Sequence, residues 1–209
     1  MNRIILRVLT GIVLFVLLQA YQSEPVKQPI DYVDPFIGTD FFGDVFPGPT
    51  VPYSMIHVSP DTYNKGWLYR KGYVYTDSSM VGFTHTHGGG GGGEILLMPT
   101  TRQHIQTLPG DISKPGSGYR SRFSHLNEKA SPGYYQVRLT DNNVNVELTS
   151  TARAAMHRYT FPKSEFSRII IDLDYSINGH GLPANAHLRF VNDSTIEGVR
   201  RSVNTTGNI

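Results

Sequence analysis

His85 and His87 stand two residues apart, each preceded by a threonine, in the segment of this sequence richest in groups that bind ligands, metals or protons. In an extended chain alternate side chains share a face, so this spacing predicts both imidazoles on one face. Three roles then compete: hydrogen bonds to a ligand, ligation of a metal ion, and structural bonds inside the fold. Zinc or iron needs a third ligand nearby. The sequence provides only the distant Asp77 and Glu94 as a third ligand, so no metal ligands are predicted.

An aromatic cluster precedes the histidines. Trp67 is the only tryptophan, and Tyr69, Tyr73 and Tyr75 follow it closely. Such rings stack on the apolar face of a pyranose, with core packing as the alternative. Tyr73 and Tyr75 are two residues apart, which predicts that they share one side of a strand and line a cleft. Asp77 is a candidate for hydrogen bonds to sugar hydroxyls or for capping the turn that follows. The predicted substrate-binding residues are therefore Trp67, Tyr73, Tyr75, Asp77, His85 and His87.

The carboxylates single out no catalytic pair. Cleavage of a glycosidic bond with inversion needs an acid and a base about 6.5 to 9.5 Å apart, on opposite sides of the sugar ring. No motif or spacing selects two residues from the available set, which is Asp44, Asp61, Asp77, Glu94, Asp111, Glu128, Asp172 and Asp174. No catalytic residue is predicted in this chain.

Short segments of alternating apolar and polar residues dominate the second half of the chain. They are bounded by turn-forming residues such as Asp141-Asn142-Asn143. The predicted strands cover 135–139, 144–148, 154–161, 168–173, 187–191 and 195–200. With no amphipathic helix of three turns, this pattern predicts an all-β protein with an antiparallel β-sandwich. The expected core positions are Val137, Leu139, Val144, Val146, Leu148, Ile169, Ile171 and Leu173.

Ahead of these strands, residues 31–61 are dense in glycine and proline, which forbids a helix and limits strand pairing. The segment also contains several phenylalanines, too many for a linker. It is expected to form structured loops that pack on a core or line a cleft. Residues 72–83 are rich in aromatic and β-branched residues around a polar turn, and they predict two short strands.

Composition narrows the function classes. The 19 Lys and Arg are nearly balanced by 17 Asp and Glu and form no basic block, which argues against a nucleic-acid partner. The absence of cysteine removes disulfides, thiolate metal sites and cysteine nucleophiles. A chain of 209 residues suits one domain and an export segment.

The first twenty residues predict export. Arg3 and Arg7 precede an apolar run, Val8 to Leu18, that is short for a bilayer span. We expect a signal peptide over 1–20, a polar tether over 21–30 and a sandwich domain over 31–209, with a retained signal anchor as the alternative. Tyr21 stands where a lipoprotein signal has cysteine. Cleavage after residue 20 would leave no stable membrane span and a periplasmic or extracellular protein.

A series of short sequence motifs occurs in the order and at the spacing found in a known protein family. They include Val33-Asp34-Pro35-Phe36-Ile37-Gly38-Thr39, Gly82-Phe83-Thr84-His85-Thr86-His87, Glu128-Lys129-Ala130-Ser131-Pro132-Gly133-Tyr134-Tyr135 and His157-Arg158-Tyr159-Thr160-Phe161-Pro162. Over residues 31–201 the sequence closely resembles the N-terminal domain of glycoside hydrolase family 92. It departs from that family in the glycine run Gly88–Gly93 and in Phe41-Phe42-Gly43-Asp44, both in expected substrate loops.

The resemblance implies a two-part enzyme: a sandwich similar to the galactose mutarotase superfold, followed by a helical barrel with the catalytic acid, the base and a calcium ion. The family resembles exo-α-mannosidases that invert the anomeric centre. The chain is then the substrate-binding accessory domain of a secreted α-mannosidase. It would hold no cofactor itself, would be inactive alone, and would have α-mannoside glycans and the missing barrel as partners. Residues 204–209 have the character of an interruption, and the domain is expected to be incomplete there. The alternatives are an independent carbohydrate-binding module and a metal-dependent enzyme built on the two histidines.

Overall fold

The structure is a computed structural model that describes residues 26–88, 91–92, 94–179 and 181–203, together with Arg3, Arg7 and Ile12. The chain divides into two units, Met1–Val33 and Asp34–Ile209. The predicted signal peptide and its cleavage site lie outside the described residues, apart from Arg3, Arg7 and Ile12. Within the described part, no helix has the length and hydropathy needed to cross a membrane. The expected interruption at residues 204–209 also lies outside.

The first unit contains one regular element among its described residues, the 3-10 helix η1 at Pro29–Tyr32. The side chain of Asp31 accepts a hydrogen bond from the backbone N–H of Gln28 at 2.7 Å, which satisfies a donor at the helix start. The helix η1 lies where the expected tether ends and the resemblance to the family begins.

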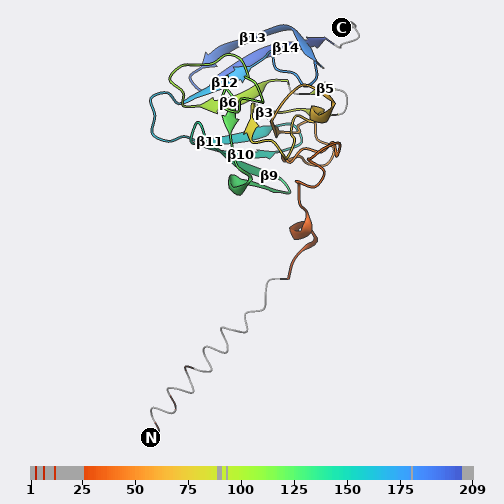
Figure 1. Cartoon of the computed structure of the whole chain (residues 1–209), viewed down its shortest axis with the longest axis vertical. Helices are drawn as coiled ribbons and strands as arrows, with labels where there is room; N and C mark the ends of the chain where they lie inside the picture. Colours follow the sequence, from red (N-terminus) through yellow and green to blue (C-terminus); the bar gives the residue numbers. More distant parts are fainter. Residues whose placement is uncertain are drawn as a thin grey trace. The chain divides into compact units, whose positions relative to one another are not determined.

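Two four-stranded antiparallel sheets form the second unit and stack on each other (Figure 1). The first has the order β1-β3-β6-β12, with strands Ser59–Asp61, Gly82–Thr84, Leu96–Thr100 and Arg168–Asp172. The second has the order β11-β10-β9-β8, with strands Ala155–Thr160, Val144–Ser150, Tyr134–Leu139 and Glu128–Ser131. The predicted all-β antiparallel sandwich is confirmed.

Alternation of apolar and polar residues determines which side of the second sheet faces the core. Val146 of β10 pairs with Val137 of β9, and every second residue of both strands is buried between the sheets. The turn between the strands closes on Asn143, which adopts a left-handed conformation at φ 51° that asparagine tolerates well. The predicted core positions on these strands are therefore confirmed, with exposures of 0 to 1% for Val137, Leu139, Val144, Val146 and Leu148.

The prediction for β12 is wrong. Ile169 is 48% exposed, and Ile170 packs against the core instead. Ile171 and Leu173 line a cavity on the outer side of the first sheet. Its three consecutive isoleucines, Ile169 to Ile171, show no alternation of apolar and polar residues, so the sequence pattern does not tell the inner side from the outer.

The partner on that outer side is a long hairpin of β13, Leu182–Asn192, and β14, Thr195–Val203 (Figure 1). Arg200 fastens it, because its guanidinium donates to the backbone carbonyls of Leu173, Tyr175 and Gly181 at 2.7 to 3.1 Å. A cavity of about 250 Å³ remains between hairpin and sheet. The hairpin therefore forms a third layer that is less tightly packed than the sandwich core.

Two-stranded ribbons and two short 3-10 helices complete the second unit's described elements. The ribbons pair β2, Ser79–Met80, with β7, Ser121–Arg122, and β4, His87–Gly88, with β5, Gly91–Gly92. The helices are η2, Trp67–Tyr69, and η3, His125–Asn127. The two strands predicted within 72–83 are present only as β2 and the start of β3, and residues 72–78 form a loop. Residues 34–58 form the structured loops that were expected.

Burial of Val146 gives the simplest test of the sandwich. Val146→Asp should lower the free energy of unfolding by about 4 kcal/mol or more, because it places an unpaired charge between the sheets. Asn145→Asp adds the same charge one residue earlier, at a position facing away from the core, and should change stability by less than about 0.5 kcal/mol. Denaturant unfolding followed by circular dichroism compares them, and equal losses would show that Val146 is not in the core.

Candidate functional site

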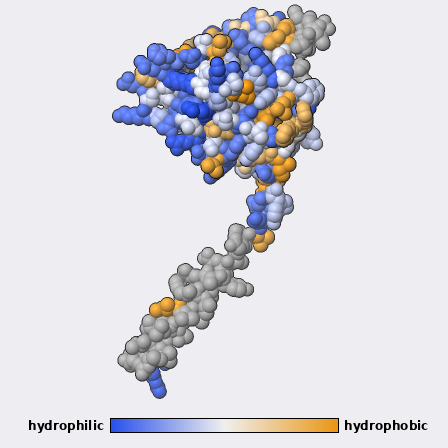
Figure 2. Space-filling view, viewed as in Figure 1, coloured by the Kyte–Doolittle hydropathy of each residue, from blue (hydrophilic) through white to orange (hydrophobic). Residues whose placement is uncertain are grey.

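Exposed apolar side chains gather on the loops that precede β1 and β2. In Figure 2 orange atoms lie over the loops drawn brown to gold in Figure 1. Their members, exposed by 37% or more, are Ile37, Phe41, Phe42, Val45, Tyr53, Met55, Trp67 and Tyr75. We call this surface the loop face. Apolar surface gathered in this way marks an interaction site more often than a chance exposure.

Trp67 is the largest ring of the loop face and is 66% exposed. Gly66, at φ 89°, starts the 3-10 turn that carries it. The guanidinium of Arg70 lies 3.9 Å from the centre of the indole ring and is paired with the carboxylate of Asp44. The cation therefore covers one side of the indole and orients it before any ligand arrives, while the rest of the ring stays open to solvent.

Tyr75 forms a second platform on the same face. Its ring stacks on the imidazole of His125, with 4.1 Å between centroids and 14° between planes, and the edge of Phe36 approaches it at 5.6 Å. Its backbone N–H donates to the carbonyl of Thr39 at 3.0 Å, which ties the two loops together. Tyr75 is 37% exposed, so its ring remains within reach of a ligand.

Tyr73 lies below the loop face rather than on it. Only 2% of it is exposed, and its hydroxyl donates to the carboxylate of Glu128 at 3.0 Å. Burial, with the nearby Glu128 charge, raises the pKa of Tyr73 well above its usual value. Glu128 also accepts a bond from Nδ1 of His125 at 2.6 Å. Tyr73 and Tyr75 do not share one side as predicted, because residues 72–78 are not a strand; Tyr73 supports the residue on which Tyr75 stacks.

Asp77 keeps an unused acceptor. Its Oδ1 accepts a hydrogen bond from the hydroxyl of Tyr69 at 3.2 Å. Its Oδ2 is buried and has no hydrogen-bond partner among the described residues. Burial raises the pKa of Asp77. The carboxyl group can therefore take one more hydrogen bond, from water or from a hydroxyl that reaches it.

Both ring nitrogens of His87 are occupied inside the fold. Its Nδ1 lies 2.6 Å from the carbonyl oxygen of His57, and its Nε2 lies 2.8 Å from Oδ1 of Asp61. Asp61 also accepts a hydrogen bond from the hydroxyl of Thr84 at 2.8 Å. With 2% of its surface exposed, His87 has a structural arrangement and no nitrogen left for a sugar.

His85 belongs to a different network, which joins the two sheets. Its Nδ1 must carry a proton, because it lies 3.2 Å from the carbonyl oxygen of Ile95, which only accepts. Neutral His85 then accepts at Nε2 from Nε2–H of His157, 2.9 Å away, and His157 accepts at Nδ1 from the hydroxyl of Tyr159 at 2.9 Å. Hydrogen bonding alone thus fixes both tautomers.

The two histidines therefore do not converge. β3 ends at Thr84, so the period-two geometry expected of His85 and His87 does not hold. No three His, Asp or Glu side chains in the described part of the chain come together as a metal ion would require. The residues that the sequence did not single out are Phe36, Arg70 and His125, whose contacts with Tyr75 and Asp44 bridge at least 26 residues and leave no local signal.

The histidine pair predicts a pH dependence. Burial and the neighbouring His85 lower the pKa of His157 to about 3, and burial lowers the pKa of His85. The unfolded chain takes up these protons near pH 6.5, so the stabilisation is complete above that pH and is lost as the pH falls toward 3. We expect the pair to account for a loss of about 2 kcal/mol between pH 7 and pH 4.5.

His157→Gln tests this, because glutamine can still donate to His85 but cannot titrate. Unfolding free energies at both pH values should show most of the loss removed in His157→Gln and retained in His187→Gln, an exposed position on β13. An unchanged pH dependence in His157→Gln would show that the pair is not the cause.

Known proteins provide an independent comparison. Residues 32–209 match the glycosyl hydrolase family 92 N-terminal domain. The family 92 α-mannosidase from Bacteroides thetaiotaomicron, solved in complex with mannoimidazole, is 39% identical with a TM-score of 0.78 over 83% of this chain. An inverting family 92 mannosidase of the same organism is 25% identical with a TM-score of 0.63 over 87% of this chain. An uncharacterized secreted glycosidase of Arthroderma benhamiae is 32% identical over 63% of this chain.

The chain spans only part of these relatives, 23% and 24% of the two solved mannosidases and 17% of the secreted glycosidase. The family match, in contrast, extends over most of the chain, from residue 32 to residue 209. The chain therefore belongs to glycosyl hydrolase family 92, in which it corresponds to the N-terminal domain.

Proposed function

We propose that the chain is the substrate-facing domain of an exported exo-α-mannosidase, and that its loop face contacts the glycan. The observation that carries the proposal is the open indole of Trp67, held by the Arg70–Asp44 ion pair in a domain whose solved relatives include an α-mannosidase and an inverting mannosidase. An aromatic ring fixed in this way offers an apolar surface to the C–H face of a pyranose at little entropic cost.

Tyr75 and Asp77 complete this proposal. The ring of Tyr75 is a second stacking surface, and Oδ2 of Asp77, which has no hydrogen-bond partner among the described residues, is the acceptor that we assign to a sugar hydroxyl. Tyr73 and His87 support the face from below, and His85 links the sheets. The substrate-binding set proposed from structure is therefore Trp67, Tyr75 and Asp77.

We assign the hydrolytic step to residues outside this chain. Inversion needs a carboxylic acid that donates to the leaving oxygen and a carboxylate that activates water. Three carboxylates near the loop face are committed to other bonds, Asp44 to Arg70, Asp61 to His87, and Glu128 to Tyr73 and His125, which leaves Asp77 without a second carboxylate to act with it. Calcium prefers six to eight oxygen ligands, carboxylates among them, and the described residues contain no group of three His, Asp or Glu side chains placed to hold a metal ion. A calcium requirement is therefore proposed for the larger part of the enzyme.

Export is part of the same proposal. Two arginines followed by a short apolar run are typical of a secretory signal, and one relative is named as a secreted glycosidase. An α-mannosidase acting on glycans outside the cytoplasm is consistent with both observations.

The chain alone should not hydrolyse α-mannosides. We expect no release of 4-nitrophenol from 4-nitrophenyl α-mannopyranoside, with or without added calcium, because we assign the catalytic acid and base to residues outside this chain. The control is the same chain carrying Glu128→Gln, which should be equally inactive. Calcium-dependent release by the unmodified chain that Glu128→Gln abolishes would overturn this division of roles.

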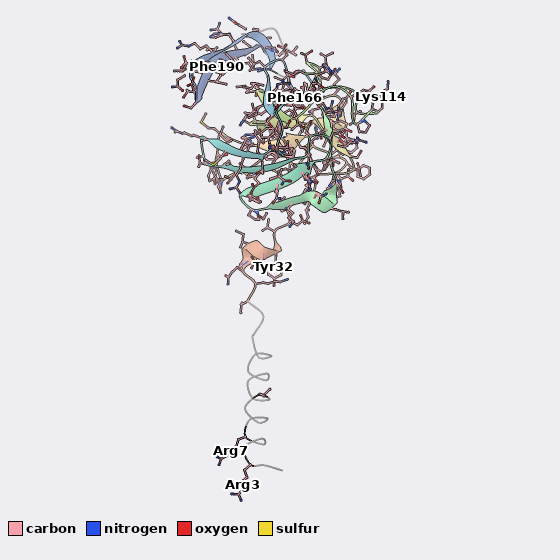
Figure 3. All side chains as sticks on the ribbon, turned by 90° about the vertical axis from the view of Figure 1, so that its left-hand side faces the viewer. Arg3, Arg7, Tyr32, Lys114, Phe166 and Phe190 are labelled. Carbon is pink, nitrogen blue, oxygen red and sulfur yellow. The ribbon has the colours of Figure 1, made fainter. Side chains whose placement is uncertain are left out.

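Binding should depend on Trp67. Trp67→Ala should weaken binding of α-mannobiose about tenfold, which corresponds to about 1.4 kcal/mol, with little change in melting temperature because the ring is exposed. Phe190→Ala removes an aromatic ring that is 80% exposed on β13 (Figure 3) and should leave binding unchanged. Isothermal calorimetry measures both, and equal affinities in the two variants would exclude Trp67 from the site.

A further inference from the structure

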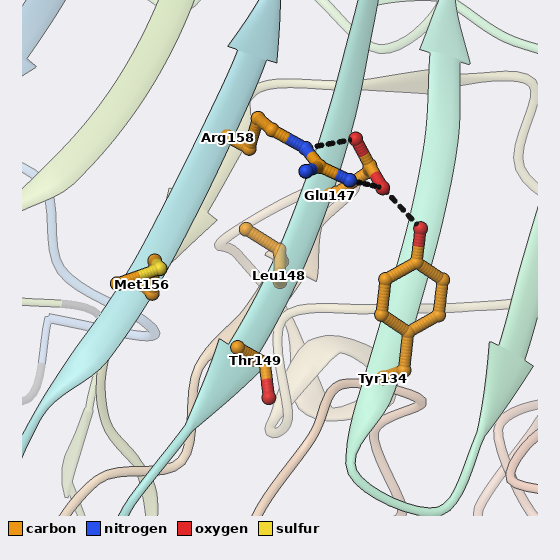
Figure 4. Close-up of a pocket in the computed structure, with 6 residues that line it drawn as sticks. All are labelled: Tyr134, Glu147, Leu148, Thr149, Met156 and Arg158. Carbon is orange, nitrogen blue, oxygen red and sulfur yellow. Dashed lines mark hydrogen bonds and ion pairs between the residues drawn. The ribbon is translucent and has the colours of Figure 1, made fainter.

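The outer face of the second sheet has a shallow depression that shares no residue with the loop face. Strand pairing places Glu147 of β10 opposite Arg158 of β11, and Thr149 opposite Met156. Tyr134, at the start of β9, lies beside them (Figure 4). The depression has a volume of about 180 Å³ and is lined by Tyr134, Glu147, Leu148, Thr149, Met156 and Arg158.

The ring of Tyr134 is fixed on this surface. Its hydroxyl donates to Oε1 of Glu147 at 2.6 Å. Glu147 is itself held by Arg158, whose Nε donates to Oε2 at 2.6 Å and whose Nη2 donates to Oε1. Figure 4, which looks onto the sheet, shows the ring nearly face on, with its hydroxyl directed at the carboxylate. A flat phenol whose orientation is set in advance loses little entropy when a ligand stacks on it.

The charges around the ring compensate one another. Hydrogen bonds from Arg158 and Tyr134 lower the pKa of Glu147 to about 2, and Glu147 raises the pKa of Arg158. Both groups are therefore ionised at neutral pH and sum to zero. Such a site has no net charge with which to select an anion or a cation. It presents polar atoms at the edge of an aromatic ring, which suits a neutral molecule with many hydroxyls.

Two more side chains fit that ligand. Met156 is 68% exposed and forms an apolar wall across Leu148 from the ring. Nη1 of Arg158 donates no hydrogen bond to any described residue, so it is available to a hydroxyl. A volume of 180 Å³ corresponds to about six water molecules. That room is enough for one sugar ring resting on the surface.

We propose that this depression is a second sugar-binding site, which takes a single neutral hexopyranose stacked on Tyr134 and bonded by Glu147 and Arg158. It deepens the proposed function by adding a second contact for the same class of glycan. It does not depend on the loop face, because the two surfaces have no residue in common. A domain with two weak sites holds a polymeric glycan more tightly than either site alone.

Matched variants of Tyr134 separate binding from a structural role. Tyr134→Phe and Tyr134→Leu both lose the hydrogen bond to Glu147, but only Tyr134→Leu loses the aromatic face. If the residue merely fastens the strands, the two variants will behave alike. If it stacks on a sugar, Tyr134→Phe will bind within about threefold of the unmodified chain and Tyr134→Leu will bind at least about tenfold more weakly.

The test is a titration of the 15N-labelled chain with methyl α-D-mannopyranoside, followed by amide chemical shifts. We expect saturable shifts at the amides of residues 134, 147 and 156 in the unmodified chain and in Tyr134→Phe, whereas Tyr134→Leu should need at least about ten times as much sugar for shifts of the same size. The proposal is overturned by an unmodified chain without these shifts, or by variants that bind equally. Shifts near Trp67 report the loop face separately, so failure at one surface is distinguishable from failure at the other.

Discussion

The buried contact between His87 and Asp61 is the constraint on which both the sandwich and the loop face depend. Nδ1 and Nε2 of His87 lie 2.6 and 2.8 Å from oxygen atoms of His57 and Asp61, so both ring nitrogens form hydrogen bonds inside the fold. Both side chains are fully shielded from water. A buried polar pair of this kind is stable only while complete, since removing one partner typically costs about 3–5 kcal/mol.

Asp61 also connects the His87 contact to the loops, through its hydrogen bonds and its close contact with Gly72. It ends β1, its side chain accepts from Thr84 of β3, and its backbone carbonyl accepts from the N–H of Val81 at 2.8 Å. The chain returns to it at Gly72, where φ is 77° and an added Cβ would lie 1.8 Å from Oδ1 of Asp61. Only glycine fits there. The carbonyl of Gly72 then accepts from the N–H of Thr62 at 2.7 Å, which closes the loop carrying Trp67.

The prediction of buried core positions is correct for strands with one side facing water and the other side facing the core. Between Val137 and Leu148, apolar and polar residues alternate along β9 and β10, and the apolar residues are the buried ones. The prediction was wrong for β12, because three consecutive isoleucines show no alternation and Ile169 is 48% exposed. It also failed for the histidines, because extended geometry was assumed through His85 although β3 stops at Thr84.

The loop face shows the same limit. The aromatic cluster was recognisable, but the sequence does not show which rings are open. Trp67 is exposed and oriented because Arg70 pairs with Asp44, 26 residues away, and Tyr73 is buried because Glu128, 55 residues away, accepts its hydroxyl. Contacts over such separations leave no local pattern. They decide that Trp67 and Tyr75 face solvent while Tyr73 and His87 support them.

Fluorescence of Trp67, the chain's single tryptophan, tests the central claim most directly, because its emission reports on the loop face alone. Titration with methyl α-D-mannopyranoside should shift the emission to shorter wavelength and saturate, as the sugar covers the open side of the indole. An emission spectrum that stays unchanged at high sugar concentration, in protein whose circular dichroism shows an intact sandwich, would contradict the account.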